Sequence, residues 1–139
     1  MIVVDANAIV KMTVTEEHSG TVFSIIDAET AKKEPIIAPD IILAEALNAL
    51  WVNFTKKKKI TAEQLDQAES SLITIFEDLQ IIPTKELENT AMQIAKIHGL
   101  SLYDSLYAAA GLLNDAPVLS FDNKISKKAK AIGISLVNY

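Results

Sequence analysis

The sequence contains no cysteine, and this absence removes several kinds of chemistry at once. Disulfide bonds, thiolate metal sites and cysteine nucleophiles are all excluded. Only two histidines are present, so we do not expect a zinc site built from imidazole ligands. The side chains left for catalysis are carboxylates, hydroxyls and lysines.

Arginine is missing as well. All 13 basic residues are lysines, 18 residues are acidic, and the net charge is −5. Neutralisation of phosphates by basic side chains normally supplies most of the affinity of a protein for nucleic acid. The overall charge therefore counts against nucleic-acid binding.

Long hydrophobic runs are also absent. The longest, residues 41–52, is interrupted by Glu45 and Asn48 and is too short to cross a bilayer. Residues 1–5 lack the basic segment of a signal peptide. We therefore expect a cytoplasmic protein without a membrane partner, built as a single domain over residues 1–139 that can bury a sizeable core.

Short apolar runs alternate with segments of helical periodicity along the whole chain. We expect five strands, at residues 2–4, 36–38, 79–82, 117–120 and 134–137. We expect helices at residues 9–12, 15 to about 32, about 41–57, 61 to about 79, 84–98, 101–114 and 123–132. Short β-branched runs are typical of parallel strands that are buried on both faces. The pattern predicts an α/β fold, a three-layer α/β/α sandwich around a mostly parallel sheet.

Several helix ends have local signals in the sequence. Thr15 and Asp40 are the expected N-caps of the second and third helices, because their side chains can accept from free backbone N–H groups. Thr61-Ala-Glu-Gln64 has the spacing of a capping box. Gly99 is expected to end the helix over residues 84–98 in a left-handed conformation.

Two aspartates come at the ends of expected strands. Asp5 follows residues 2–4 directly, and Asp122 lies just beyond residues 117–120. Ligands of open α/β sheets bind at this carboxyl edge. The alternative for both residues is local, a helix cap or a turn. Ser120, two residues before Asp122, could orient a water molecule or a carboxylate.

Glu45 lies on a helix on which almost every other position is apolar. A carboxylate that is buried and ionised there is costly unless it is paired or coordinated. The alternative to a functional role is a partner such as Lys11 or a serine. Asn48, three residues further on, shares the same helix face and could help to orient what Glu45 holds.

Asp104 has a strong structural alternative, because Ser101-Leu-Tyr-Asp104 also has capping-box spacing. Two features favour a functional role. The small residues at positions 108–111 indicate that this helix packs closely onto the sheet. A right-handed crossover would then hold the start of the helix near the carboxyl edge of the sheet.

Together, four acids from separate elements are expected to converge on one crevice: Asp5, Glu45, Asp104 and Asp122. Carboxylates this close repel at low dielectric, so that some are protonated or a cation binds among them. Oxygen ligands without histidine or cysteine favour Mg²⁺ or Mn²⁺ over zinc. Such an ion lowers the pKa of bound water and stabilises charge on a phosphate, which is the chemistry of phosphodiester hydrolysis.

The remaining features are less informative. The run Lys56 to Lys59 fits a solvated helix end, with a patch that follows phosphates as the alternative. Tyr103 and Tyr107 are four residues apart and fit core packing better than a platform for stacking bases. Trp51 is expected in the core or at a dimer contact.

In this combination the chain resembles the PIN-domain family, and within it the VapC-type toxins of prokaryotic toxin–antitoxin pairs. The matching stretches are residues 2–11, 38–51, 98–108 and 117–124, in the order of the family and over nearly the whole chain. The resemblance implies a compact α/β/α domain around a parallel five-stranded sheet. It also implies a homodimer, and an antitoxin whose tail enters the groove of the active site.

The activity that the resemblance implies is a Mg²⁺- or Mn²⁺-dependent endoribonuclease that cuts RNA. Its acidic, metal-binding site would be Asp5, Glu45, Asp104 and Asp122. Ser120 matches the hydroxyl residue that the family has before the last aspartate. The lack of arginine departs from many relatives, and lysine has no bidentate fork for phosphate. Binding would then depend on metals and local patches.

Two other interpretations remain open at this stage. A PIN-like module could bind RNA or a partner without cutting, although a binding scaffold has no reason to keep a complete acidic quartet. An aspartyl-phosphate hydrolase of the haloacid dehalogenase type also begins with a strand that ends in aspartate. That family needs an acid in place of Asn7 and a hydroxyl in place of Ile9, and both are missing.

Overall fold

The computed structural model describes residues 1–139, in which strands and helices alternate along the chain. The strands are β1 (Ile2–Val4), β2 (Ile36–Pro39), β3 (Gln80–Ile82) and β4 (Val118–Leu119). The helices are α1 (Ala6–Val10), α2 (Ser19–Ala31), α3 (Ile42–Thr55), α4 (Ala62–Asp78), α5 (Thr84–His98), α6 (Leu102–Asn114) and α7 (Asn123–Ile132). No helix is both long enough and apolar enough to cross a membrane.

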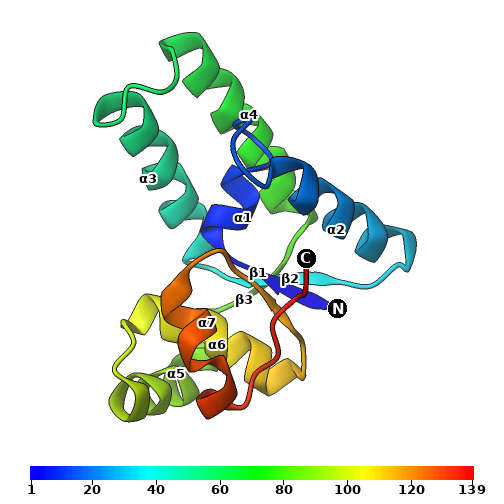
Figure 1. The fold of residues 1–139 in the computed structure, drawn as a ribbon, viewed down its shortest axis with the longest axis vertical. Coiled ribbons are helices and arrows are strands. Elements are labelled where there is room, and N and C mark those ends of the chain that lie inside the picture. The colour runs from blue at the N-terminus through cyan, green and yellow to red at the C-terminus, as the bar shows by residue number, and fades with distance from the viewer.

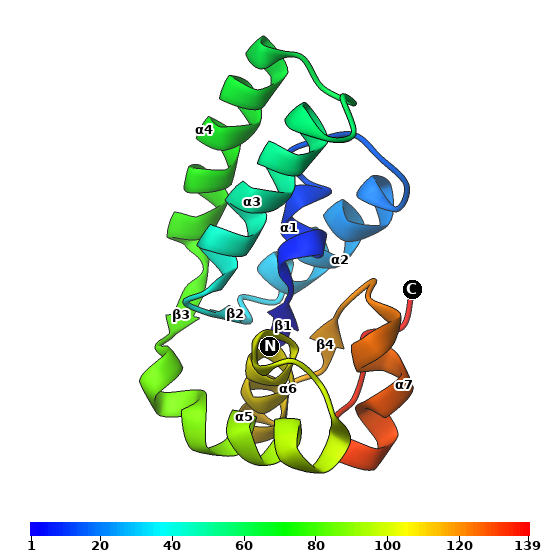
Figure 2. The same cartoon turned by 90° about the vertical axis from the view of Figure 1, so that its left-hand side faces the viewer.

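The sheet has the order β3-β2-β1-β4, and every pair of neighbouring strands is parallel. Helices α1 to α4 lie on one side of the sheet and α5 to α7 on the other, as Figure 2 shows. The expected three-layer α/β/α architecture is therefore confirmed. All four strands end at the same edge of the sheet, since they are parallel, and each leads into a helix: α1 after β1 (Figure 1), α3 after β2, α5 after β3 and α7 after β4.

The sheet has four strands, and the fifth expected strand, residues 134–137, is reduced to one bridge between Val118 and Leu136. The Val118 N–H donates to the Ser135 carbonyl at 2.9 Å, and the Val137 N–H donates to the Val118 carbonyl at 3.0 Å. Pairing stops there because β4 itself has only two residues before the chain turns towards α7.

Two predicted N-caps are wrong. Helix α2 begins at Ser19, four residues after Thr15. The Ser19 hydroxyl accepts from the Glu16 N–H and donates to the Val14 carbonyl, so it holds the preceding loop in a non-helical path.

Asp40 does not cap α3, whose first turn has no side-chain cap. Its carboxylate accepts from the backbone N–H of Thr84 at 3.0 Å and from the Thr84 hydroxyl, at the start of α5. These hydrogen bonds lower the pKa of Asp40. The contact forms because β2 and β3 are neighbours in the sheet, so their ends bring the two segments together.

Other helix ends are as predicted. Thr61 and Gln64 form both hydrogen bonds of the capping box, at 3.1 and 2.9 Å. Gly99 ends α5 in the left-handed conformation, with φ 71°. Helix α6 is buried from Ser105 to Gly111 and contacts β1, β2 and β4, as its small residues indicated.

Candidate active site

All four predicted acids lie at the starts of helices. Asp5 is the N-cap of α1, where its carboxylate accepts from the Ala8 N–H at 2.8 Å. Asp122 is the N-cap of α7 and accepts from the Lys124 N–H, also at 2.8 Å. For both residues the local alternative is correct, and it does not exclude a second role.

Glu45 and Asp104 lie in the first turns of α3 and α6. The start of a helix carries a partial positive charge, which stabilises nearby carboxylates. Four helix starts therefore face the region where the acids gather. This arrangement offsets part of the repulsion that so many carboxylates would otherwise exert on one another.

The four acids line one small polar cavity of about 110 Å³, which we name the acid cavity. The residues that line it are Asp5, Ala6, Asn7, Glu45, Asp104, Tyr107, Asp122 and Ile125. Ser120 does not line it, but it lies close enough to Asp5 to lower the pKa of that carboxyl group, and its hydroxyl accepts from the Asp122 N–H at 3.1 Å. The structure thus brings the predicted acids together and places Ser120 behind them.

Asp5 is the most deeply buried of the four, with 5 % of its surface exposed. Burial raises the pKa of Asp5 from its ordinary value of 3.8 to about 6, and the charges of Asp122 and Glu45 act in the same direction. Hydrogen bonds from Ser120 and from the Ala8 N–H act in the opposite direction. At neutral pH the Asp5 carboxylate is therefore ionised at a cost that a bound cation would offset.

Glu45 has a partner that the sequence did not indicate. The Tyr107 hydroxyl donates to its carboxylate at 2.8 Å, whereas Lys11 pairs with Glu16 instead. Burial, and to a smaller degree the charge of Asp104, raise the pKa of Glu45, while the bond from Tyr107 lowers it. Tyr107 is only 2 % exposed, so its predicted core position is confirmed, but it also fixes Glu45.

The capping-box alternative for Asp104 is only half fulfilled. The Ser101 hydroxyl accepts from the Asp104 N–H at 3.1 Å, and the structure shows no return bond from the Asp104 carboxylate. This carboxylate is partly exposed at the wall of the acid cavity. If Asp104 served only as part of a capping box, its carboxylate would accept from the backbone N–H of Ser101.

The donor set fits a hard divalent cation, because every candidate ligand is a carboxylate oxygen and Asp5 is buried among like charges. In these side-chain conformations, however, no three acidic or imidazole groups are close enough to hold one ion together. Glu45 is held by Tyr107, and Asp5 and Asp122 are engaged as helix caps. Binding would require the carboxylates to move closer together.

The secondary predictions have mixed outcomes. Tyr103 is 56 % exposed, so its predicted core position is wrong. Trp51 is 55 % exposed, which leaves the dimer contact of its two predicted positions. Asn48 is exposed and does not line the acid cavity, although it is three residues from Glu45. The run Lys56 to Lys59 is exposed, in agreement with a solvated helix end.

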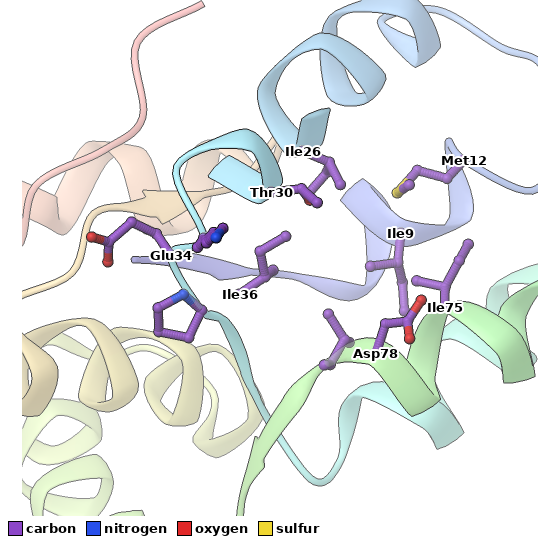
Figure 3. A pocket seen from close by; sticks show the side chains of 11 residues that line it. Ile9, Met12, Ile26, Thr30, Glu34, Ile36, Ile75 and Asp78 are labelled. Atoms are coloured by element: carbon purple, nitrogen blue, oxygen red, sulfur yellow. The ribbon is translucent and has the colours of Figure 1, made fainter. Parts of the chain in front are cut away.

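A larger cavity, of about 560 Å³, lies elsewhere, between α1, α2, β2 and α4 (Figure 3). It is mainly apolar, and Ile9, Ile26, Ile36 and Ile75 point into it. Its charged residues, among them Glu34 and Asp78, do not form a convergent group. The volume of a cavity is therefore a poor guide to the active site in this protein, because the larger cavity lacks a group of acids that converge.

The fold and the acid cavity together define an α/β protein with a carboxylate site at the carboxyl edge of a parallel sheet. A sequence profile described as the PIN domain matches residues 2–131, and the chain therefore belongs to the PIN-domain family. The resemblance seen in the sequence is thus confirmed. The match also removes the haloacid dehalogenase interpretation.

Several of the matching proteins carry VapC or VapBC names. The chain is 24 % identical over 131 residues to Ribonuclease VapC3 of Pyrobaculum aerophilum, in an alignment that covers 94 % of this chain and 96 % of that protein. Its fold resembles that of VapBC2 from Rickettsia felis, solved bound to a DNA fragment from their promoter, with TM-score 0.67, 19 % identity and coverage of 100 % and 99 %. It also resembles Mycobacterium tuberculosis VapC20, described as a Sarcin-Ricin loop cleaving toxin, with TM-score 0.67, 18 % identity and full coverage of both chains. At these identities the solved structures show the fold alone.

Proposed function

We propose that this PIN domain is a metal-dependent endoribonuclease and the toxin of a VapBC-type toxin–antitoxin pair. The observation that carries the proposal is the convergence of four carboxylates from four helix starts on one cavity. The similarity to a protein named as a ribonuclease supports RNA as the substrate. The active unit would be a single domain spanning residues 1–139, located in the cytoplasm.

In this proposal Asp5, Glu45 and Asp104 hold a Mg²⁺ or Mn²⁺ ion, and Asp122 completes the site or holds a second ion. The bound metal supplies an activated water molecule and stabilises negative charge that develops on the phosphate. The deep burial of Asp5 and its raised pKa support this assignment, because a cation would offset the cost of ionising it.

Other residues of the chain position these acids. Ser120 lowers the pKa of Asp5 and so favours its ionised form. Tyr107, which also lines the acid cavity, donates to the Glu45 carboxylate at 2.8 Å. Asn7 lines the acid cavity and is exposed, so its amide is available to donate to a phosphate oxygen of the substrate.

The proposal includes two protein partners. A cognate antitoxin is supported by the similarity to VapBC2. A homodimer is supported by the exposed apolar surface of α5 and α6, which carry most of the large hydrophobic side chains left in solvent. These are Met92, Ile97, Leu102, Tyr103, Leu112 and Leu113.

The activity is tested by incubating the purified protein with RNA in Mg²⁺ or Mn²⁺, with and without EDTA. We expect cleavage in the presence of metal, none in EDTA, and none after Asp5→Asn. Cleavage that persists in EDTA or in the Asp5→Asn protein would refute the mechanism. RNA binding without cleavage by the wild-type protein would instead favour a PIN-like module that binds without cutting.

A further inference from the structure

A second cavity, lined mainly by polar residue types, adjoins the acid cavity, and we name it the lysine cavity. It has a volume of about 380 Å³ and is lined by Gly99, Leu100, Ser101, Asp104, Lys124, Lys127 and Lys128. Asp104 belongs to both cavities, so they meet at its side chain. The lysine cavity therefore begins where the candidate metal site ends.

Three cations form one wall of this cavity. Lys124, Lys127 and Lys128 are spaced three and four residues apart on α7, which places them on a single face of the helix. All three are exposed, and none forms a salt bridge. Of the 13 lysines, only Lys11 and Lys32 are paired with glutamates. The lysine cavity thus has three positive charges that form no ion pair, and Asp104 is the one acidic residue that lines it.

The distribution of charge along the chain isolates these lysines. All 18 acidic residues lie at or before Asp122, whereas four of the 13 lysines follow it, on α7. The opposite wall is the loop before α6, and the partially positive start of that helix lies at the cavity through Ser101. Within a protein of net charge −5, this is a local environment that favours anions.

We propose that the lysine cavity is a phosphate-binding subsite for the RNA backbone, which positions the strand so that a neighbouring phosphate reaches the acid cavity. This inference rests on the proposed nuclease function and names the surface that holds its substrate. Lysine neutralises phosphate as a point charge without reading bases. The subsite therefore contributes affinity and position, and little sequence preference.

Two triple variants of equal charge test the subsite. In one, glutamine replaces the cavity lysines Lys124, Lys127 and Lys128; in the other, glutamine replaces Lys56, Lys57 and Lys58, which are exposed beyond α3. Glutamine and lysine have similar helix propensity, so both proteins should fold, which circular dichroism checks. Binding of a fluorescent single-stranded RNA is measured in Mg²⁺ as a function of salt, with Asp5→Asn in every protein to prevent cleavage.

We expect the α7 triple variant to bind RNA about tenfold more weakly at low salt. The negative slope of log affinity against log salt should become less steep by about 2, because each phosphate contact on a single strand contributes roughly 0.7 to its magnitude. The α3 triple variant should retain both the affinity and the slope. Equal behaviour of the two variants, or no measurable RNA binding by the reference protein, would overturn the proposal. A polyglutamate peptide is tested in the same way. If the α7 triple variant loses binding of this peptide but not of RNA, the proposal is overturned in favour of an acidic peptide as the ligand.

Failure of the subsite and failure of the nuclease are distinguishable in this design. If the wild-type protein cleaves RNA but the α7 triple variant binds normally, the subsite is refuted and the nuclease stands. If no RNA is cleaved but binding depends on the α7 lysines, the nuclease is refuted and the subsite stands.

Discussion

Asp5 has two roles that make opposite demands on its carboxylate. As the N-cap of α1 it accepts a backbone hydrogen bond, which favours the ionised form. As a buried group near Asp122 and Glu45 it is pushed towards the neutral form. Burial has the larger effect, so the folded protein binds a proton at Asp5 more tightly than the unfolded chain does.

This difference predicts how Asp5→Asn changes stability with pH in the metal-free protein. Because the pKa of Asp5 is raised from 3.8 to about 6, its favourable contribution is complete below pH 3.8 and is lost as the pH rises through 6. Asparagine keeps the cap without the charge. In EDTA near pH 7.5, Asp5→Asn should raise the free energy of unfolding by about 2 to 3 kcal/mol, with little effect near pH 3.5.

Urea unfolding of both proteins at the two pH values measures this difference. Asp27→Asn, at an exposed position of α2, serves as the control and should show no gain at either pH. An Asp5→Asn protein that is less stable than the wild type near pH 7.5 would mean that the buried carboxylate is not under electrostatic strain.

Tyr107→Phe removes the hydroxyl that fixes Glu45 and leaves the ring in place. The pKa of Glu45 should rise further, because the hydrogen bond from Tyr107 lowers it. We expect about tenfold slower cleavage, since loss of groups that orient metal ligands costs about 10- to 100-fold, and an activity profile shifted to higher pH. Tyr103→Phe, at an exposed position of the same helix, should leave both the rate and the pH profile unchanged.

At the scale of elements, the packing of α6 on β4 holds Asp104 against the rest of the site. Gly111 allows this approach, because a Cβ at that position would lie 2.8 Å from the Val118 Cγ2 and 3.1 Å from the Ala116 carbonyl oxygen. Val118 is fully buried and the carbonyl belongs to the backbone, so neither atom can move away easily.

Gly111→Ala should therefore lower the free energy of unfolding by about 1 to 3 kcal/mol, the usual cost of overpacking. Gly20→Ala is the matched control, because Gly20 lies in α2 and a methyl group there would have no atom within 4 Å. That substitution should raise stability by about 0.4 to 1 kcal/mol. Thermal unfolding of both variants decides the point, and a Gly111→Ala protein at least as stable as Gly20→Ala would contradict the packing described.

Helix ends were predictable where both partners of a hydrogen bond lie within a few residues. Thr61 and Gln64 are three residues apart, and their capping box is present. Asp40 has its partner at Thr84, which only the pairing of β2 with β3 brings near. Short range alone is not sufficient, however: the Ser19 hydroxyl bonds to the Glu16 N–H and the Val14 carbonyl, three and five residues away, and this loop leaves Thr15 without a helix to cap.

At the scale of the whole molecule, the strand pattern was sufficient to predict the α/β/α layers and the edge where the acids gather. It was not sufficient to predict which side chains contact one another within the site. Tyr107 and Glu45 are 62 residues apart and meet only because α6 and α3 start at the same edge. Likewise, Lys124, Lys127 and Lys128 can be recognised as neighbours of Asp104 only when the packing of α7 against α6 is known.

The central claim is that the acids of the cavity cut RNA through a bound metal, and Asp104 offers the sharpest comparison. Asp104→Asn removes a carboxylate at the start of α6, while Asp115→Asn removes one at the opposite end of the same helix. Asp115 has φ 49°, a conformation that asparagine tolerates, so both variants should fold.

The measurement is single-turnover cleavage of RNA in Mn²⁺ by the wild type and these two variants. Loss of a metal ligand should slow cleavage by about 100-fold or more, whereas Asp115→Asn should cleave like the wild type. Equal cleavage by the Asp104→Asn protein and the wild type would contradict a metal-dependent reaction at these acids.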